Sequence, residues 1–214
     1  MDLVGRALPL LLRGLAVTVG LGISAFVIGC GLGLAIALAR FSGGRLLRFA
    51  AGAYVSVFRG TPLLVQILLI YFALPQVGVR LEPIPSALLA LSLNASAYLG
   101  ENFRSGLVAV DKGQWEAALS LGMASARILR RIILPQAIRV ALPPIGSRFI
   151  ALMKDTSLAS VVTVVELTRV AENVGSATFR YMEMFVIVGV MYWIVNTLLQ
   201  LVQEGLERRM QRAY

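Results

Sequence analysis

Five apolar runs divide this chain and limit what it can fold into. They cover approximately residues 15–39, 49–74, 84–110, 135–153 and 182–202. About 20 consecutive apolar residues are enough for one helix to cross the hydrocarbon core of a membrane. We therefore expect an all-α polytopic membrane protein with five transmembrane helices. These helices would form a single transmembrane domain over residues 1–214, with no room for a second, soluble domain.

The charge content supports a membrane protein and argues against a nucleic-acid partner. Charged residues make up 14% of the chain, against about 25% in an ordinary soluble domain. The net charge of +9 would suit nucleic acid only if a soluble fold carried a basic face, and no stretch offers one. Lys and Arg also collect in the cytoplasmic loops of membrane proteins, next to the lipid. We expect a membrane lipid environment and no nucleic-acid partner.

The basic residues predict how the chain lies in the membrane. With five spans, three basic clusters fall on the same side. They are Arg40, Arg45 and Arg48; Lys112, Arg127, Arg130, Arg131 and Arg139; and Arg208, Arg209 and Arg212. The side that carries more Lys and Arg is the cytoplasmic one. The N-terminus is then outside, and the C-terminus and the segment 116–135 are in the cytoplasm.

The segment 116–135 is a polar interruption of about 20 residues, long for a connector between spans. It reads as a helix pair. Gly122 suits the left-handed conformation that ends a helix, and Ser125 could cap the second helix. Pro135 suits the first turn of the next span. Ala117 and Ala118 would leave a small, smooth surface beside Glu116, which could enter a groove in another protein.

The spacing within this segment is specific. Glu116, Ala117 and Ala118 are followed after three residues by Gly122, and after nine more by Ile132, Leu134 and Pro135. This pattern resembles the signature loop of the membrane subunits of bacterial ABC importers. The resemblance implies a cytoplasmic coupling loop at about residues 113–134, in which Glu116, Ala117, Ala118 and Gly122 dock into the ATP-hydrolysing subunit.

Further segments resemble the polar amino acid branch of these importers, the histidine, glutamine and arginine type. They are residues 57–66, Ser96-Ala97-Tyr98 with Glu101 and Arg104, Gly113-Gln114, residues 154–158 and residues 166–168. The methionine-type importers share the loop and a similar arginine-proline segment, so a methionine-type permease is the alternative within the class. The first fifty residues and residues 171–183 carry little family information.

The resemblance implies the type I ABC importer fold and a set of partners. These are nucleotide-binding ATPase subunits, a second copy of this permease or a homologous one, an extracytoplasmic solute-binding protein and an amino acid substrate. The chain has no G-x-x-x-x-G-K-[ST] phosphate loop. We therefore expect that it binds no cofactor and is no enzyme, and that the partner ATPase binds ATP and Mg. The location implied is the bacterial cytoplasmic (inner) membrane.

The third run carries an unusual set of polar residues. Asn94, Tyr98, Glu101 and Ser105 follow helical spacing, so they share one face. A charge near the bilayer centre costs about 2.5–3.5 kcal/mol on insertion scales, so this face should meet protein or water. Glu101 and Arg104 are three residues apart and could pair. They could form a structural ion pair, or Arg104 could bind a solute carboxylate through its two-pronged guanidinium.

A second polar group ends the fourth run. Asp155 could accept from a solute ammonium group, pair with Lys154 or serve the helix end, and Thr156 and Ser157 offer neutral hydrogen bonds. The resemblance places both groups around the translocation path. The candidate path residues are Glu101, Asn102, Arg104, Asp155, Thr156 and Ser157.

Three prolines lie inside the runs: Pro62 in the second, and Pro143 and Pro144 in the fourth. Proline interrupts the backbone hydrogen bonds of a helix, and the freed groups need partners or a cavity. These positions are either static kinks or hinges that open and close the path.

A self-contained secondary transporter or channel for small polar solutes is the main alternative function. Such transporters often consist of paired halves, whereas five spans cannot divide equally. The odd count suggests a pore that a second subunit completes. An intramembrane enzyme would need a nucleophile and a base, and the chain offers no credible pair. The chain has no His and one cysteine, Cys30, so we expect no metal site.

Overall fold

The computed structural model describes residues 2–211, and within this part the regular elements are all helical. The helices are α1 Asp2–Ser42, α2 Arg45–Gly60, α3 Leu63–Leu68, the π-helix η1 Leu69–Ala73, the 3-10 helix η2 Leu74–Val77, α4 Pro83–Val108, α5 Lys112–Ser120, α6 Ser125–Ile128, the π-helix η3 Leu129–Ile133, α7 Leu134–Asp155, the 3-10 helix η4 Thr156–Val162, α8 Leu167–Thr178 and α9 Tyr181–Gln211. The all-α fold predicted from the apolar runs is therefore confirmed.

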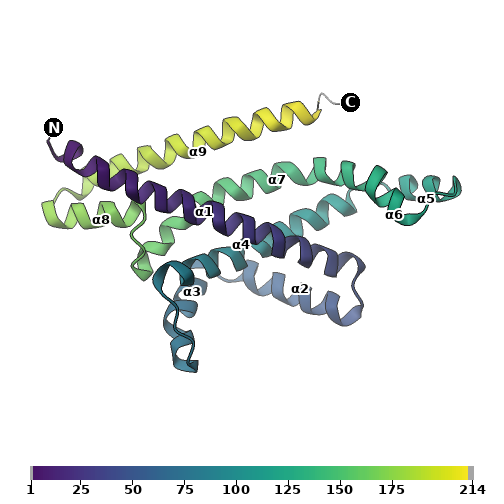
Figure 1. The fold of residues 1–214 in the computed structure, drawn as a ribbon, viewed down its shortest axis with the longest axis horizontal. Helices are drawn as coiled ribbons and strands as arrows, with labels where there is room; N and C mark the ends of the chain where they lie inside the picture. The colour runs from purple at the N-terminus through teal and green to yellow at the C-terminus, as the bar shows by residue number, and fades with distance from the viewer. Residues whose placement is uncertain (1, 212–214) are drawn as a thin grey trace.

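The long helices α1, α4 and α7 pack together, with α4 against both α1 and α7, while α9 lies along α7 and diverges from α1 toward its C-terminus (Figure 1). The main core joins α1, α3, α4, α7 and η4 through Leu21, Ile67, Leu91, Leu152 and Val162. Small residues allow α1 and α4 to approach closely. A Cβ atom on Gly33 would lie 2.9 Å from the backbone nitrogen of Gly100, a distance that leaves room only for hydrogen.

A second core holds α8 against the start of α1 and of α9, through Leu11, Val170 and Met184. At its centre lies the carboxylate of Glu166, which is fully buried. It caps the N-terminus of α8 by accepting the backbone N–H groups of Thr168 and Arg169, at 2.9 and 2.8 Å. It also accepts the Tyr192 hydroxyl of α9 at 2.9 Å. One carboxylate thus fixes α8 to α9.

The second apolar run is not one straight helix. α2 and the helical segment 63–77 meet at an angle of 105°, and the segment projects sideways from the bundle (Figure 1). The break falls at Thr61 and Pro62, because Pro62 has no N–H group to continue α2 and instead precedes the first turn of α3. The interruption expected at Pro62 is confirmed, and the structure adds the sharp turn.

By length and apolar composition alone, fewer helices qualify as membrane spans than the five expected from the sequence. Within the described residues, α1 and α9 are long and apolar enough to cross a membrane, and the bent α2–α3 pair would be a third. α4 and α7, with 26 and 22 residues, are long enough but carry many polar side chains. Several of those side chains, among them Asn94, Glu101 and Arg148, pair with other side chains of the protein, so mean hydropathy undervalues both helices as possible spans. The count of five spans stays a prediction.

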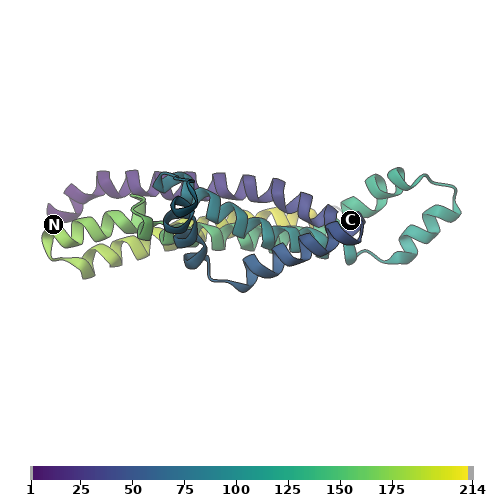
Figure 2. The same cartoon turned by 90° about the horizontal axis from the view of Figure 1, so that it is seen from below.

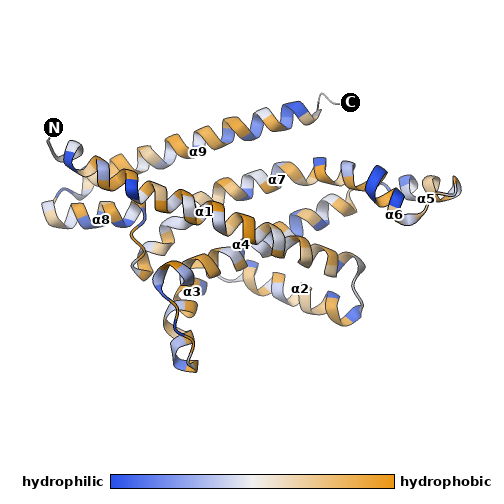
Figure 3. Ribbon diagram, in the orientation of Figure 1, coloured by the Kyte–Doolittle hydropathy of each residue, from blue (hydrophilic) through white to orange (hydrophobic). Residues whose placement is uncertain are grey.

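Hydrophilic residues gather at the ends of the bundle, whereas much of α1, α7 and α9 is apolar (Figure 3). The C-terminal ends of α1 and α9 and the α5–α6 segment lie at the same end of the molecule (Figures 1 and 2). The three basic clusters predicted to share one side therefore lie together, as far as they fall in the described residues; Arg212 lies outside them.

Candidate functional site: a projecting helix pair and a polar network inside the bundle

The helix pair predicted at 116–135 is present and projects beyond the end of the bundle (Figure 2). Asp111 caps α5 by accepting the Gly113 N–H at 2.6 Å. Gly122 ends it with a positive φ of 72°. The N–H groups of Gly122 and Met123 donate back to the carbonyls of Leu119 and Ala118, at 2.9 and 3.2 Å, which is the Schellman arrangement of a helix C-terminus. The predicted role of Gly122 as the helix stop is confirmed.

The pair has a small core of its own, and this changes the predicted docking surface. Ala118 is buried together with Ile128 and Ile133, so it cannot form part of an exposed surface. Ala117 and Glu116 are exposed, and Leu121 beside them is 82% exposed. The outward face of α5 is therefore Glu116 with Ala117 and the leucine at its end, while Ala118 holds α5 on the following helix.

Ser125 does not cap the second helix. The cap is Ala124, and Ser125 is the first residue of α6. From there helical turns continue without a break through the π-helix η3 into α7, with Pro135 in the first turn of α7 as predicted. The second helix of the pair is therefore continuous with α7, which carries Arg148 and Asp155 in the bundle interior.

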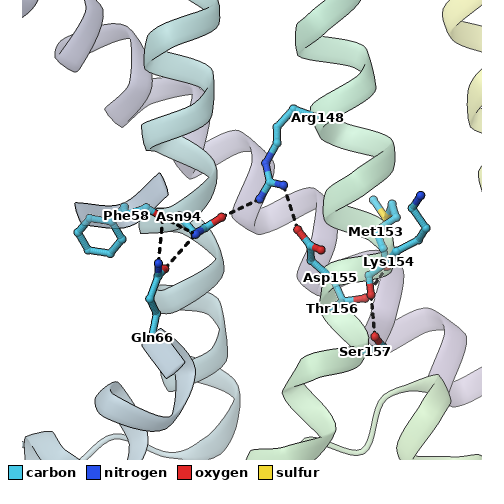
Figure 4. A network of polar contacts seen from close by, with 9 residues as sticks. All are labelled: Phe58, Gln66, Asn94, Arg148, Met153, Lys154, Asp155, Thr156 and Ser157. Atoms are coloured by element: carbon cyan, nitrogen blue, oxygen red, sulfur yellow. Dashed lines mark hydrogen bonds and ion pairs between the residues drawn. The ribbon is translucent and has the colours of Figure 1, made fainter. Parts of the chain in front are cut away.

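Arg148, in the middle of α7, is the centre of a polar network inside the bundle (Figure 4). Its guanidinium donates to the Asp155 carboxylate at 3.0 Å and to the side-chain oxygen of Asn94 at 2.9 Å. The Asn94 amide in turn donates to the Gln66 side-chain oxygen at 3.0 Å. The network therefore connects α7 to α4, and α4 to the bend between α2 and α3.

Gln66 holds the bend itself. Its amide donates to the Phe58 carbonyl at 2.9 Å and to the Thr61 hydroxyl at 2.8 Å. The Asn94 amide also donates to the Phe58 carbonyl, at 3.0 Å. The break between α2 and α3 leaves the Phe58 carbonyl without a helical partner, because Pro62 has no N–H group, and the amides of Gln66 and Asn94 satisfy it.

Tyr98 lies one turn from Asn94 and between two guanidinium groups. Arg148 lies 4.6 Å from the centre of its ring and Arg59 lies 5.1 Å from it, both within the range of a cation–π interaction. The Nε of Arg148 is buried and has no hydrogen-bond partner within the described residues. The Arg148 guanidinium therefore contacts the Asp155 carboxylate and the face of the Tyr98 ring, and its Nε can still donate a hydrogen bond.

Glu101 lies two turns of α4 beyond Asn94, about 10 Å along the helix axis, and belongs to a separate cluster of charged side chains. It pairs with Arg104, whose Nε donates at 2.8 Å, and with Arg40 of α1. The predicted Glu101–Arg104 pair is confirmed, and Arg40 is an additional partner. From Asn94 to Glu101 the predicted polar face contacts other side chains of the protein, as the cost of a membrane-embedded charge favours, whereas Ser105 on the same face is exposed.

The structure does not bring the six candidate path residues into one site. Asp155 pairs with Arg148, and the predicted alternative of pairing with Lys154 is wrong, because adjacent helical residues point in different directions whereas residues seven apart share a face. Thr156 is buried, and its hydroxyl donates to the Met153 carbonyl at 2.7 Å. Ser157 likewise donates to the Lys154 carbonyl at 2.7 Å.

Pro143 and Pro144, inside α7, do not break the helix, and side chains from both neighbouring helices contact their carbonyls. Asn102 of α4 donates to the Pro144 carbonyl at 3.0 Å. Gln203 of α9 donates to the Pro143 carbonyl at 3.1 Å. Asn102 thus contributes to the α4–α7 contact, and the proline pair is the place where α7 meets both neighbours.

Sequence reasoning missed Arg148, Gln66 and Gln203. An arginine inside an apolar run is itself a signal of a functional site, so Arg148 could have been found from its position alone. Gln66 and Gln203 carried no such signal, because their roles depend on which backbone carbonyls lie opposite them.

A helical bundle with a projecting helix pair is the architecture expected of a membrane transport subunit. Comparisons with known proteins place the chain in this class. A family model described as binding-protein-dependent transport system inner membrane component matches residues 29–212. The L-cystine transport system permease protein TcyB of Bacillus subtilis (strain 168) is 45% identical over 213 residues, 99% of this chain and 91% of the relative. The glutamine transport system permease protein GlnP of Escherichia coli (strain K12) is 37% identical over 207 residues, 96% of this chain and 94% of the relative.

A solved structure confirms the predicted fold class. The crystal structure of an amino acid ABC transporter with histidines superposes with a TM-score of 0.91 at 41% identity, covering 95% of each chain. The chain therefore belongs to the family of inner membrane components of binding-protein-dependent transport systems. It is an ABC transporter permease with the type I importer fold.

Proposed function

We propose that this chain forms the translocation path of an ATP-driven importer for polar amino acids. The observation that carries the proposal is its likeness, over nine tenths or more of both chains, to permeases named for cystine and glutamine transport. This likeness favours an ABC permease over a self-contained secondary transporter or channel. It also favours the polar amino acid branch over the methionine type.

The projecting helix pair couples the path to a separate ATPase. Glu116 and Ala117 face outward on α5, with Leu121 at its end, while Ala118 and Gly122 fix the shape of the pair. Because Ala118 packs on Ile128 and Ile133, and α6, η3 and α7 are continuous, a movement of α5 reaches α7 through this packed contact. ATP and Mg belong to the partner ATPase, and this chain catalyses no covalent step.

The solute passes along the polar face of α4 and α7. A zwitterionic amino acid carries a carboxylate and an ammonium group, and Arg148 and Asp155 offer the complementary charges. Arg is suited to the carboxylate because its planar guanidinium donates two hydrogen bonds. The Glu101–Arg104 pair and Asn102 line the inward part of the path, with Thr156 and Ser157 at the far end of α7.

Pro62, Pro143 and Pro144 are the hinge positions of this path. Pro62 lies at the bend that Gln66 stabilises by a hydrogen bond. Pro143 and Pro144 lie where side chains of α9 and α4 donate hydrogen bonds to the backbone of α7. Movement at these points would change the contacts of Arg148 with α4, and so link opening of the path to its charges.

The chain lies in the bacterial cytoplasmic membrane with its N-terminus outside and α9 ending in the cytoplasm. The basic clusters at one end of the bundle support this orientation through the positive-inside rule. An extracytoplasmic binding protein delivers the amino acid at the other end, and a second permease, identical or homologous, completes the pore.

Uptake in cells tests the proposal. A strain without its own uptake of cystine, glutamine and basic amino acids receives this chain together with its ATPase and binding protein. We expect labelled uptake of one polar amino acid or one group of them, abolished when an inactive ATPase is supplied. Uptake that continues with the inactive ATPase would support the secondary transporter, and uptake of methionine alone the methionine type.

A further inference from the structure

A purely apolar groove of about 370 Å³ lies between the C-terminal half of α1 and the start of α7, with α4 as its floor. Every side chain that lines it is apolar. They include Leu34, Leu38 and Phe41 from α1, Phe103 from α4, and Leu134 and Ile138 from α7.

The groove opens toward the outside of the bundle. Leu34 and Ile138, on its two walls, are each 48% exposed. Leu34, Leu38 and Phe41 are spaced four and three residues apart, so they form one continuous wall. Leu129 and Leu134 lie five residues apart yet both line the groove, because the π-helix η3 adds a residue to the turn between them.

Basic residues flank, along the chain, the groove-lining residues Phe41 and Leu129. The two segments that include these residues, 40–48 and 125–131, contain six arginines and no acidic residue. Arg40 pairs with Glu101. Arg127 and Arg130, next to the groove-lining Leu129, are exposed on the helices that lead into α7. An apolar slot with cations at one end matches the shape of a phospholipid with a negative headgroup.

We propose that this groove binds one acyl chain of an anionic phospholipid, whose headgroup phosphate contacts Arg127 and Arg130. The site rests on the proposed membrane location, which puts the arginines at the cytoplasmic headgroups. The bound lipid contacts α1 with its chain and the helix pair with its headgroup. It therefore supports the segment that joins α5 to α7 from the lipid side.

Lipid retention by the purified full chain tests the site. The protein is reconstituted in vesicles of equal parts phosphatidylcholine and phosphatidylglycerol, extracted in mild detergent, and analysed by native mass spectrometry. We expect one phosphatidylglycerol per chain to be retained in preference to phosphatidylcholine. Equal retention of the two lipids, or retention of neither, would overturn the proposal.

Two variants locate the lipid. Ile138→Trp should fill the groove and abolish retention, whereas Leu198→Trp, on an exposed position of α9 that lines no part of the groove, should not. Retention by Ile138→Trp would contradict the site. A change in the mass of the assembly with lipid retention unchanged would show that a second copy of the chain covers this face.

A charge variant tests the headgroup contact and does not depend on repacking the groove. Each basic side chain near an anionic surface contributes about fivefold in affinity, so Arg127→Gln with Arg130→Gln should weaken phosphatidylglycerol binding roughly 25-fold. Arg208→Gln with Arg209→Gln removes the same charge at the end of α9 and should leave retention unchanged. Equal loss of phosphatidylglycerol retention in both double variants would contradict the headgroup contact, because the preference would then depend only on the overall surface charge. The assay uses no ATPase or solute, so its failure is distinct from failure of the proposed transport.

Discussion

The guanidinium of Arg148 lies 3.0 Å from the carboxylate of Asp155, two turns away on the same helix. The same guanidinium also contacts Asn94 of α4 (Figure 4). An ion pair that spans two turns of α7 and also holds a neighbouring helix responds to any movement between α4 and α7. It can therefore act both as a structural contact and as a site for an incoming zwitterion.

A double-mutant cycle separates these two roles. Arg148→Gln and Asp155→Asn should each lower stability by roughly 2 kcal/mol, below the range for fully buried pairs because Asp155 is 30% exposed. The double variant should recover much of that loss, since no unpaired charge remains, yet it should not transport. Thermal unfolding in detergent and uptake in vesicles give the two readouts. A double variant that transports at the normal rate would restrict the pair to a structural role.

Charge reversal on the helix pair should uncouple transport from ATP hydrolysis. Glu116 is exposed on the outward face of α5, so Glu116→Lys should abolish ATP-dependent uptake without lowering the amount of protein in the membrane. The control is Ser125→Lys. Ser125 is an exposed residue at the start of α6 whose side chain does not cap the helix, so this variant should keep most of the activity. Normal uptake by the Glu116 variant would argue against docking through this face.

The stop of α5 should depend on the backbone of Gly122. No atom lies within 4 Å of the position of a Cβ there, so Gly122→Ala costs only the left-handed conformation, about 1–2 kcal/mol. Gly122→Asn should be milder because Asn tolerates this conformation. Gly20→Ala, in the open interior of α1, is expected to be neutral or stabilising. Equal melting temperatures for the two alanine variants would mean that the left-handed conformation at position 122 carries no penalty for alanine.

Glu166 should stabilise α8 far more than its neighbours do. Glu166→Ala leaves two backbone N–H groups and the Tyr192 hydroxyl without their acceptor, which should cost roughly 2–3 kcal/mol. The matched control is Glu172→Ala on the same helix. It removes an ion pair with Arg169 whose two side chains are about one-third exposed, and should cost about 0–1 kcal/mol. Thermal unfolding of both variants tests the difference, and similar losses would refute a special role for the buried carboxylate.

The sequence predicted the elements whose signals are local. Gly122, Pro62 and Pro135 act on their own backbone, so the end of α5, the bend after α2 and the start of α7 could all be expected. The Glu101–Arg104 pair was predictable for the same reason, since three residues along a helix suffice to bring the two side chains together.

The contacts between helices could not be predicted in this way. Asn94 and Arg148 are 54 residues apart in sequence, and only the packing of α4 on α7 brings them together. The burial of Ala118 likewise depends on how α5 folds back onto Ile128 and Ile133. Ser125 was expected to cap α6, but its place one residue inside the helix gives that position to Ala124.

Reconstitution in vesicles with and without the ATPase tests the central claim most directly. The purified chain is placed in sealed vesicles with the binding protein outside and labelled amino acid supplied there, with or without the ATPase and ATP inside. The account predicts that the solute accumulates above its external concentration only when ATPase and ATP are both present. Accumulation by the chain in the absence of the ATPase would contradict it.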